Sequence, residues 1–109
     1  MKTITLITLL GFALPALADR LPLPPDTPSS FKSECASCHL PYPPSLLAAP
    51  DWRKIMAGLD NHFGSDAAVD AKKRLEITNF LQRHAGDARR LGSAGDPPRL
   101  TKTPRFVHK

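Results

Sequence analysis

Two thiols and one imidazole lie within the short run Cys35-Ala-Ser-Cys38-His39. The spacing Cys-x-x-Cys-His is the attachment signature of a c-type haem. The two thiols add across the vinyl groups of the haem, and the histidine becomes the proximal ligand of its iron. One helical turn separates the two cysteines, so a helical run would turn both sulfur atoms toward the same porphyrin edge. The motif therefore predicts one covalent haem c on Cys35 and Cys38, with His39 bound to the iron.

A Cys-x-x-Cys pair also occurs in redox disulfides and as half of a zinc site. Zinc would need two further thiol or imidazole ligands, and the sequence contains only 2 cysteines. A thioredoxin-like pair belongs to a pattern of alternating strands and helices, which this sequence lacks. The histidine directly after Cys38 and the export signal described next favour haem over both alternatives.

Residues 1–18 have the features of a cleavable secretory signal. Lys2 precedes an apolar run, Ile4 to Leu14, that is too short to span a bilayer, and residues 16–18 supply a small-x-small cleavage site. An uncleaved membrane anchor is the alternative. We expect a mature chain that starts at Asp19, does not span the membrane and resides in the periplasm, outside the cytoplasm as attachment of c-type haem requires.

Without the signal, the chain carries 14 basic and 10 acidic residues. The basic excess is concentrated from Arg83 onward. Nucleic-acid binding is a poor explanation for an exported protein, so no nucleic-acid partner is expected. Two interpretations stay open: a docking surface for an acidic redox partner, and a solvated basic tail.

Helical patterns follow the motif region, and no strand signals are found. Residues 19–28 contain four prolines and are expected to form a linker. A first helix is expected to start at Ser29 or Ser30, either of which could cap it, and to carry both cysteines. Residues 40–44 contain three prolines and are expected to be an extended loop.

Two further helices are expected from apolar residues at helical spacing. The first begins at Pro50 and Asp51 and ends at Gly64, with the apolar stripe Trp52, Ile55, Met56, Leu59, His62 and Phe63. The second spans residues 70–85, with Asp70 as its cap and the stripe Ile77, Phe80, Leu81 and His84. The predicted fold is all-α: a small cytochrome c-like helical domain, residues 29–86, wrapped around one covalent haem. Residues 87–109 are expected to be a basic, flexible and disordered tail.

The sixth ligand position of the iron determines much of the function. A methionine there raises the reduction potential, a second histidine leaves it lower, and an open position admits small gases. Four side chains are candidates: Met56, His62, His84 and His108. Periodicity does not choose among them, since a methionine on an apolar stripe is often core filler and a histidine in a last helical turn often interacts with exposed carbonyls.

Several stretches resemble the bacterial dihaem cytochrome c family (the DHC type). These are Glu34 to Leu47, Trp52 to Leu59, His62 to Ala67, the helix with Ile77 and Phe80-Leu81, and Thr103 to Val107. Haems in that family are taken to be ligated by two histidines, and the resemblance implies that the histidine of the His-Phe-Gly motif, His62, is the distal ligand. It also implies electron transfer rather than catalysis. The implied partners are redox proteins such as a membrane cytochrome b or a small soluble haem protein.

Family members carry a second Cys-x-x-Cys-His, whereas the 2 cysteines of this sequence can attach one haem. We therefore expect either a single-haem relative or a truncated remnant of a dihaem protein. The predicted function is that of a periplasmic one-electron carrier with two histidine ligands. The alternative is a haem-based gas binder or sensor with an open sixth position. No acid-base constellation supports a haem enzyme.

Overall fold

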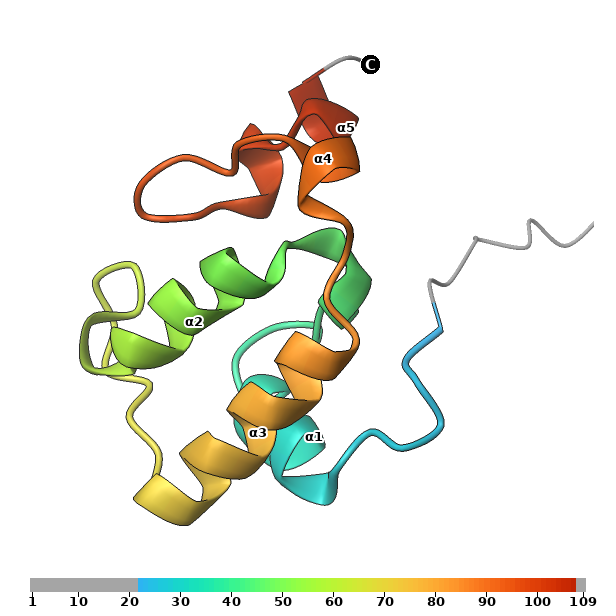
Figure 1. Ribbon diagram of the computed structural model, residues 1–109. Coiled ribbons are helices and arrows are strands. Elements are labelled where there is room, and N and C mark those ends of the chain that lie inside the picture. The colour runs from blue at the N-terminus through green and yellow to red at the C-terminus, as the bar shows by residue number, and fades with distance from the viewer. Residues whose placement is uncertain (1–21, 108–109) are drawn as a thin grey trace, which may run out of the picture.

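The computed structural model describes residues 22–107 (Figure 1). These residues form helices joined by loops and contain no strand, in the order α1 (Ser29–Cys35), η1 (Pro44–Leu46), α2 (Ala49–Ala57), η2 (Leu59–Asn61), α3 (Ala71–Arg83), α4 (Ala88–Leu91), η3 (Leu100–Lys102) and α5 (Pro104–Val107), where η marks a 3-10 helix. The all-α class predicted from the sequence is confirmed. No helix in this range has the length and apolar character needed to cross a membrane. The expected signal peptide, residues 1–18, lies outside the described residues.

The core forms where α1 and α2 pack against α3, which also contacts η1. Its buried members are Phe31, Leu47, Trp52, Met56, Ile77, Phe80, Leu81 and Ala94. Phe80 is fully buried, and its ring centre lies 5.0 Å from that of Phe31 on α1. The apolar residues Ile77, Phe80 and Leu81 predicted for α3 therefore face the core. Both α1, which leads into the cysteine motif, and α2, which precedes His62, pack against α3.

The helix α1 is shorter than the sequence suggests. It ends at Cys35, so Cys38 lies in the turn that follows, and the prediction that this helix carries both cysteines is wrong for Cys38. The hydroxyl of Ser37 donates a hydrogen bond to the Glu34 carbonyl oxygen at 2.8 Å. Such local side-chain bonds compete with helix continuation.

The helix α2 also ends early, at Ala57, with Gly58 as its C-cap. The prediction of one helix up to Gly64 is wrong, because His62 and Phe63 follow η2 in a loop. Phe63 has φ of +53° and Gly64 has φ of +94°, values that a right-handed helix cannot contain. The start of α3 is as predicted, with the Asp70 carboxylate accepting the N–H of Lys73 at 2.9 Å.

The C-terminal segment differs from the predicted disordered tail. Residues 88–107 form α4, η3 and α5, and Ala94 and Thr103 within them are 2% and 1% exposed. In Figure 1, α4 and α5 lie on the side of α2 away from α1. Helices of four residues are too short to show an apolar period, so periodicity could not predict them.

Candidate haem-binding site

The structure brings together two histidines from different parts of the chain. The ring centres of His39 and His62 lie 6.3 Å apart, and the ring planes differ by 23°. A metal–imidazole bond of about 2.0–2.1 Å, with about 1.2 Å from that nitrogen to its ring centre, gives about 6.4 Å between two imidazoles on opposite sides of one metal ion. The two residues therefore have the separation that a shared iron requires.

The imidazole of His39 is oriented by the backbone beside it. Its Nδ1–H donates a hydrogen bond to the Leu40 carbonyl oxygen at 2.7 Å, since a carbonyl can only accept. Nε2 then keeps its lone pair for a metal. Metal-binding histidines commonly donate their second N–H in this way, which fixes tautomer and ring orientation.

His62 is fixed by a tight loop. Its N–H donates to the Ser65 carbonyl oxygen at 2.7 Å, and the Ser65 N–H returns a bond of 3.2 Å to the His62 carbonyl. The Asn61 side chain accepts the N–H of Gly64 at 3.2 Å. Partial burial, and to a smaller extent the charge of His39, lower the pKa of His62. Both effects favour the neutral imidazole, which is the form that binds metals.

The two cysteines lie in different surroundings. Cys35 is half-buried against the core, whereas Cys38 is exposed, and both are free thiols. Burial, reinforced by the negative charge of Glu34, raises the pKa of the Cys35 thiol to about 11. The chain runs directly from these thiols to His39, so the three motif residues form one continuous surface segment.

Contacts between α1 and α3 position this motif segment. The Ser30 hydroxyl donates to Glu76 at 2.6 Å, and the Lys73 ammonium donates to Glu34 at 2.7 Å. Ser30 therefore bonds to α3 and does not cap α1, whose N-cap is Pro28. Together with the Phe31 ring in the core, these contacts fix the helix that leads into the cysteines.

The loop after the motif is held by a buried hydrogen bond. The indole Nε1–H of Trp52 donates to the Pro44 carbonyl oxygen at 2.7 Å. Farther along, the N–H of Gly86 donates to the Leu47 carbonyl at 2.9 Å. Residues 44–47, which follow the motif and precede α2, are thus bonded both to α2 and to Gly86 in the loop after α3.

The other candidates for the sixth ligand have different surroundings. His84 donates from Nε2 to the Asp26 carboxylate at 2.8 Å, and Arg83 contacts the same carboxylate at 3.4 Å. Met56 is 5% exposed and packs in the core. His108 lies outside the described residues. Of the candidates that the structure describes, His62 is the one whose ring lies close to that of His39, with 6.3 Å between the ring centres.

Apolar side chains gather around the two histidines. Leu40 and Phe63, each next to one of them in sequence, are 79% and 43% exposed. The ring centre of Tyr42 lies 5.2 Å from that of His39. These side chains leave an exposed apolar surface beside the two histidines. An apolar porphyrin would suit this surface, and His39, His62 and the thiols of Cys35 and Cys38 are the residues that would hold it.

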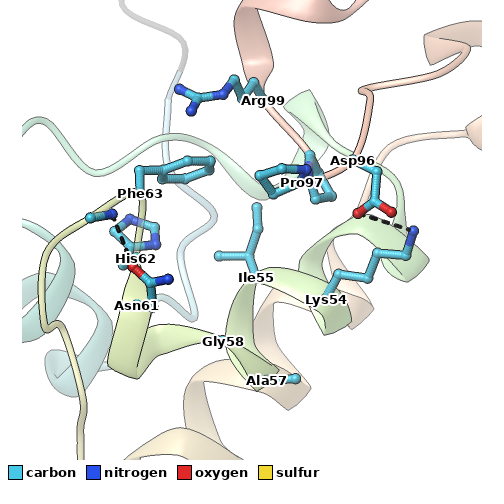
Figure 2. Close-up of a pocket in the computed structure, with 12 residues that line it drawn as sticks. Lys54, Ile55, Ala57, Gly58, Asn61, His62, Phe63, Asp96, Pro97 and Arg99 are labelled. Atoms are coloured by element: carbon cyan, nitrogen blue, oxygen red, sulfur yellow. Dashed lines mark hydrogen bonds and ion pairs between the residues drawn. The ribbon is translucent and has the colours of Figure 1, made fainter.

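A cavity of about 480 Å³ adjoins His62 on the side of α2 and of residues 96–99 (Figure 2). Its lining includes Phe63 and Arg99, whose guanidinium carbon lies 4.5 Å from the Phe63 ring centre. Sequence analysis did not identify Arg99. No local pattern marks it, because its contact is with a segment far away in the sequence.

Comparison with known proteins shows the family to which the sequence is similar. The family model for dihaem cytochrome c matches residues 31–109. A crystal structure of DHC purified from Rhodobacter sphaeroides is 39% identical with a TM-score of 0.65, covering 75% of this chain and 69% of that one. A diheme cytochrome c from Rhodobacter sphaeroides is 36% identical with a TM-score of 0.67, covering 76% and 72%. A diheme cytochrome type c from Shewanella baltica is 35% identical with a TM-score of 0.62, covering 73% and 58%. No curated protein matches the sequence.

Proposed function

Because the chain belongs to the dihaem cytochrome c family, and is therefore a c-type cytochrome of the electron-carrying kind, we propose that it works in the periplasm with one haem whose iron is bound by both His39 and His62. The haem supplies a centre that gains and loses one electron, with no bond made or broken on a substrate. Thioether bonds to Cys35 and Cys38 anchor it.

The observation that carries this proposal is the 6.3 Å separation of the His39 and His62 ring centres. Two imidazoles keep an iron six-coordinate, which leaves no position open for a gas or a substrate. The loop bonds of His62 restrain its backbone, and the Nδ1–H bond of His39 restrains its ring. Little then has to move when the iron changes oxidation state, which favours rapid electron transfer.

The proposed haem count of one differs from the count in the family name. The sequence contains 2 cysteines, both within one Cys-x-x-Cys-His motif, so it has covalent attachment points for one haem. The intact mass of the purified protein tests this count. We expect the mass of the polypeptide from Asp19 plus one haem; a mass with two haems, or with none, would contradict the proposal. The same spectrum tests cleavage after residue 18.

Absorption spectroscopy of the purified, haem-bearing protein tests the ligation. We expect a low-spin spectrum in both oxidation states and no change when carbon monoxide is added to the reduced protein. A high-spin spectrum that shifts with carbon monoxide would instead support the gas-binding alternative. A protein without haem absorption would support the truncated-remnant alternative.

The proposed partners are other redox proteins, such as a membrane cytochrome b or a small soluble haem protein. Support comes from the family and from the basic excess of the sequence, which suits an acidic partner surface. Stopped-flow mixing of the reduced protein with such a partner, at increasing salt, tests this. We expect electron transfer that slows as salt screens the charges.

A further inference from the structure

The cavity beside His62 contains three charged side chains, Lys54, Asp96 and Arg99. The Lys54 ammonium and the Asp96 carboxylate lie 3.9 Å apart and balance each other. Figure 2 shows this pair at one end of the cavity and Arg99, above the Phe63 ring, at another. Within residues 22–107, no carboxylate lies within 4.0 Å of the Arg99 guanidinium. The cavity therefore has one positive charge without a counterion from the described residues.

Arg99 is fixed relative to the proposed ligand. Its guanidinium lies over the face of Phe63, and the Phe63 ring centre lies 4.9 Å from that of His62 at an interplanar angle of 62°. The Arg99 backbone is also held, since its N–H donates to the Ala94 carbonyl oxygen at 2.8 Å. A cation stacked on an aromatic face loses little further freedom when it binds an anion. Phe63 thus links a cation in the C-terminal segment to an axial histidine.

We propose that Arg99 binds a propionate carboxylate of the haem. This inference rests on the proposed function, because it requires a haem held by the Cys35–His39 motif. The propionates are the two carboxylates that a haem carries, and a guanidinium can bind a carboxylate through two parallel hydrogen bonds. The unbalanced positive charge of the cavity has the right sign, and its place beside His62 puts it near the porphyrin. The segment around residues 96–99 would then form part of the haem site.

The pairing has a consequence for the iron. A propionate whose charge is neutralised by Arg99 does little to stabilise the ferric state. Without the guanidinium, the full negative charge acts on the iron, favours oxidation and lowers the reduction potential. The carboxylate also loses charge-assisted hydrogen bonds, which alters its vibrational frequencies.

The test compares three variants of the haem-bearing protein with the wild type. Arg99→Gln removes the charge, Arg99→Lys keeps the charge without the planar fork, and Arg90→Gln removes an exposed charge from α4 outside the cavity lining. Resonance Raman spectroscopy measures the propionate modes, and redox titration measures the potential. We expect Arg99→Gln to shift one propionate mode and to lower the potential more than Arg90→Gln does. Arg99→Lys should also shift this propionate mode, but it should lower the reduction potential less than Arg99→Gln does.

Equal potentials in Arg99→Gln and Arg90→Gln, with unchanged propionate modes, would overturn the assignment. The Raman modes report on the carboxylate itself, so they test Arg99 whichever residue occupies the sixth position. A high-spin wild type with a shifted mode in Arg99→Gln would contradict ligation by His62 and still support Arg99. A low-spin wild type with unshifted modes would contradict the role of Arg99 alone.

Discussion

The ring centres of His39 and His62 lie 6.3 Å apart, although the two residues come from loops that follow different helices. His39 follows the turn after α1, and His62 follows η2 at the end of α2. Both helices pack on α3, so the separation of the two rings depends on the helical core. The fold therefore sets the spacing of these two histidines through packing.

Replacing His62 with alanine should open the sixth position. We expect the His62→Ala protein to become high-spin, to bind carbon monoxide when reduced, and to return to a low-spin spectrum when free imidazole is added. His84→Ala is the matched control, because His84 pairs with Asp26 and its loss should leave the spectrum unchanged. If His62→Ala stayed low-spin and unreactive to carbon monoxide, another side chain would have to be the ligand.

The proximal half of the site could be predicted from local sequence. Cys35, Cys38 and His39 form one short motif, and its chemistry depends on spacing alone. Ligation by His62 stays a prediction from the family resemblance, which the ring geometry supports. Apolar spacing placed His62 on a helix, and this was wrong. Apolar periodicity depends on side-chain polarity alone. It therefore could not predict the positive φ at Phe63, which a right-handed helix does not contain.

Contacts between distant segments could not be predicted. The stripe Ile77, Phe80 and Leu81 was identified because α3 is long enough to show a period. The order between residues 88 and 107 depends instead on small buried groups, Ala94 and Thr103, and on short helices. The stacking of Arg99 on Phe63 likewise joins positions that no local pattern connects.

The bond from Trp52 to the first residue of η1 should contribute measurably to stability. Trp52→Phe keeps an aromatic ring but removes the Nε1–H, which leaves the Pro44 carbonyl oxygen without this buried donor. Leaving one buried acceptor unpaired costs about 1–3 kcal/mol of the free energy of unfolding. Urea denaturation followed by far-ultraviolet circular dichroism measures the change. Leu75→Ala is the control, because Leu75 lies on α3 and is 63% exposed. This substitution should change the free energy of unfolding by less than about 0.5 kcal/mol. Equal effects of the two substitutions would contradict the role of this bond.

The backbone at Gly86 should not accept a side chain. A Cβ there would collide with the Ser45 carbonyl oxygen and with the Leu91 side chain. The Gly86 N–H also bonds to Leu47, so the segment cannot move away without losing that bond. We expect Gly86→Ala to lower the free energy of unfolding by about 1–3 kcal/mol.

Gly58→Ala is the matched control for Gly86→Ala. The nearest atom to a Cβ at Gly58 is the Lys54 carbonyl oxygen at 3.7 Å, an ordinary contact, and φ there is −114°. We expect a change within about 1 kcal/mol, since alanine also restricts the unfolded chain. Thermal denaturation of both variants measures the difference. A tolerated Gly86→Ala would show that η1 and the end of α3 are farther apart than in this structure.

The two thiols should differ in reactivity in a chain prepared without haem. Burial raises the pKa of Cys35 from an ordinary 9.0 to about 11, while Cys38 is exposed. At pH 9, about half of an ordinary thiol but only about 1% of one with a pKa of 11 is thiolate, the reactive form. We expect iodoacetamide to modify Cys35 more slowly than the exposed Cys38, with mass spectrometry of the peptides as the measurement.

The same shift has a consequence for stability. The folded chain keeps the Cys35 proton to a higher pH than the unfolded chain does. The protonated Cys35 therefore contributes fully to the free energy of unfolding below pH 9, and this contribution is lost as the pH rises toward about 11. Cys35→Ala should remove this part of the alkaline loss, whereas Cys38→Ala should not. Urea denaturation between pH 8 and pH 11 measures both. Equal labelling rates at the two cysteines, with the same alkaline loss in both variants, would show that α1 does not pack on α3 before the haem is attached.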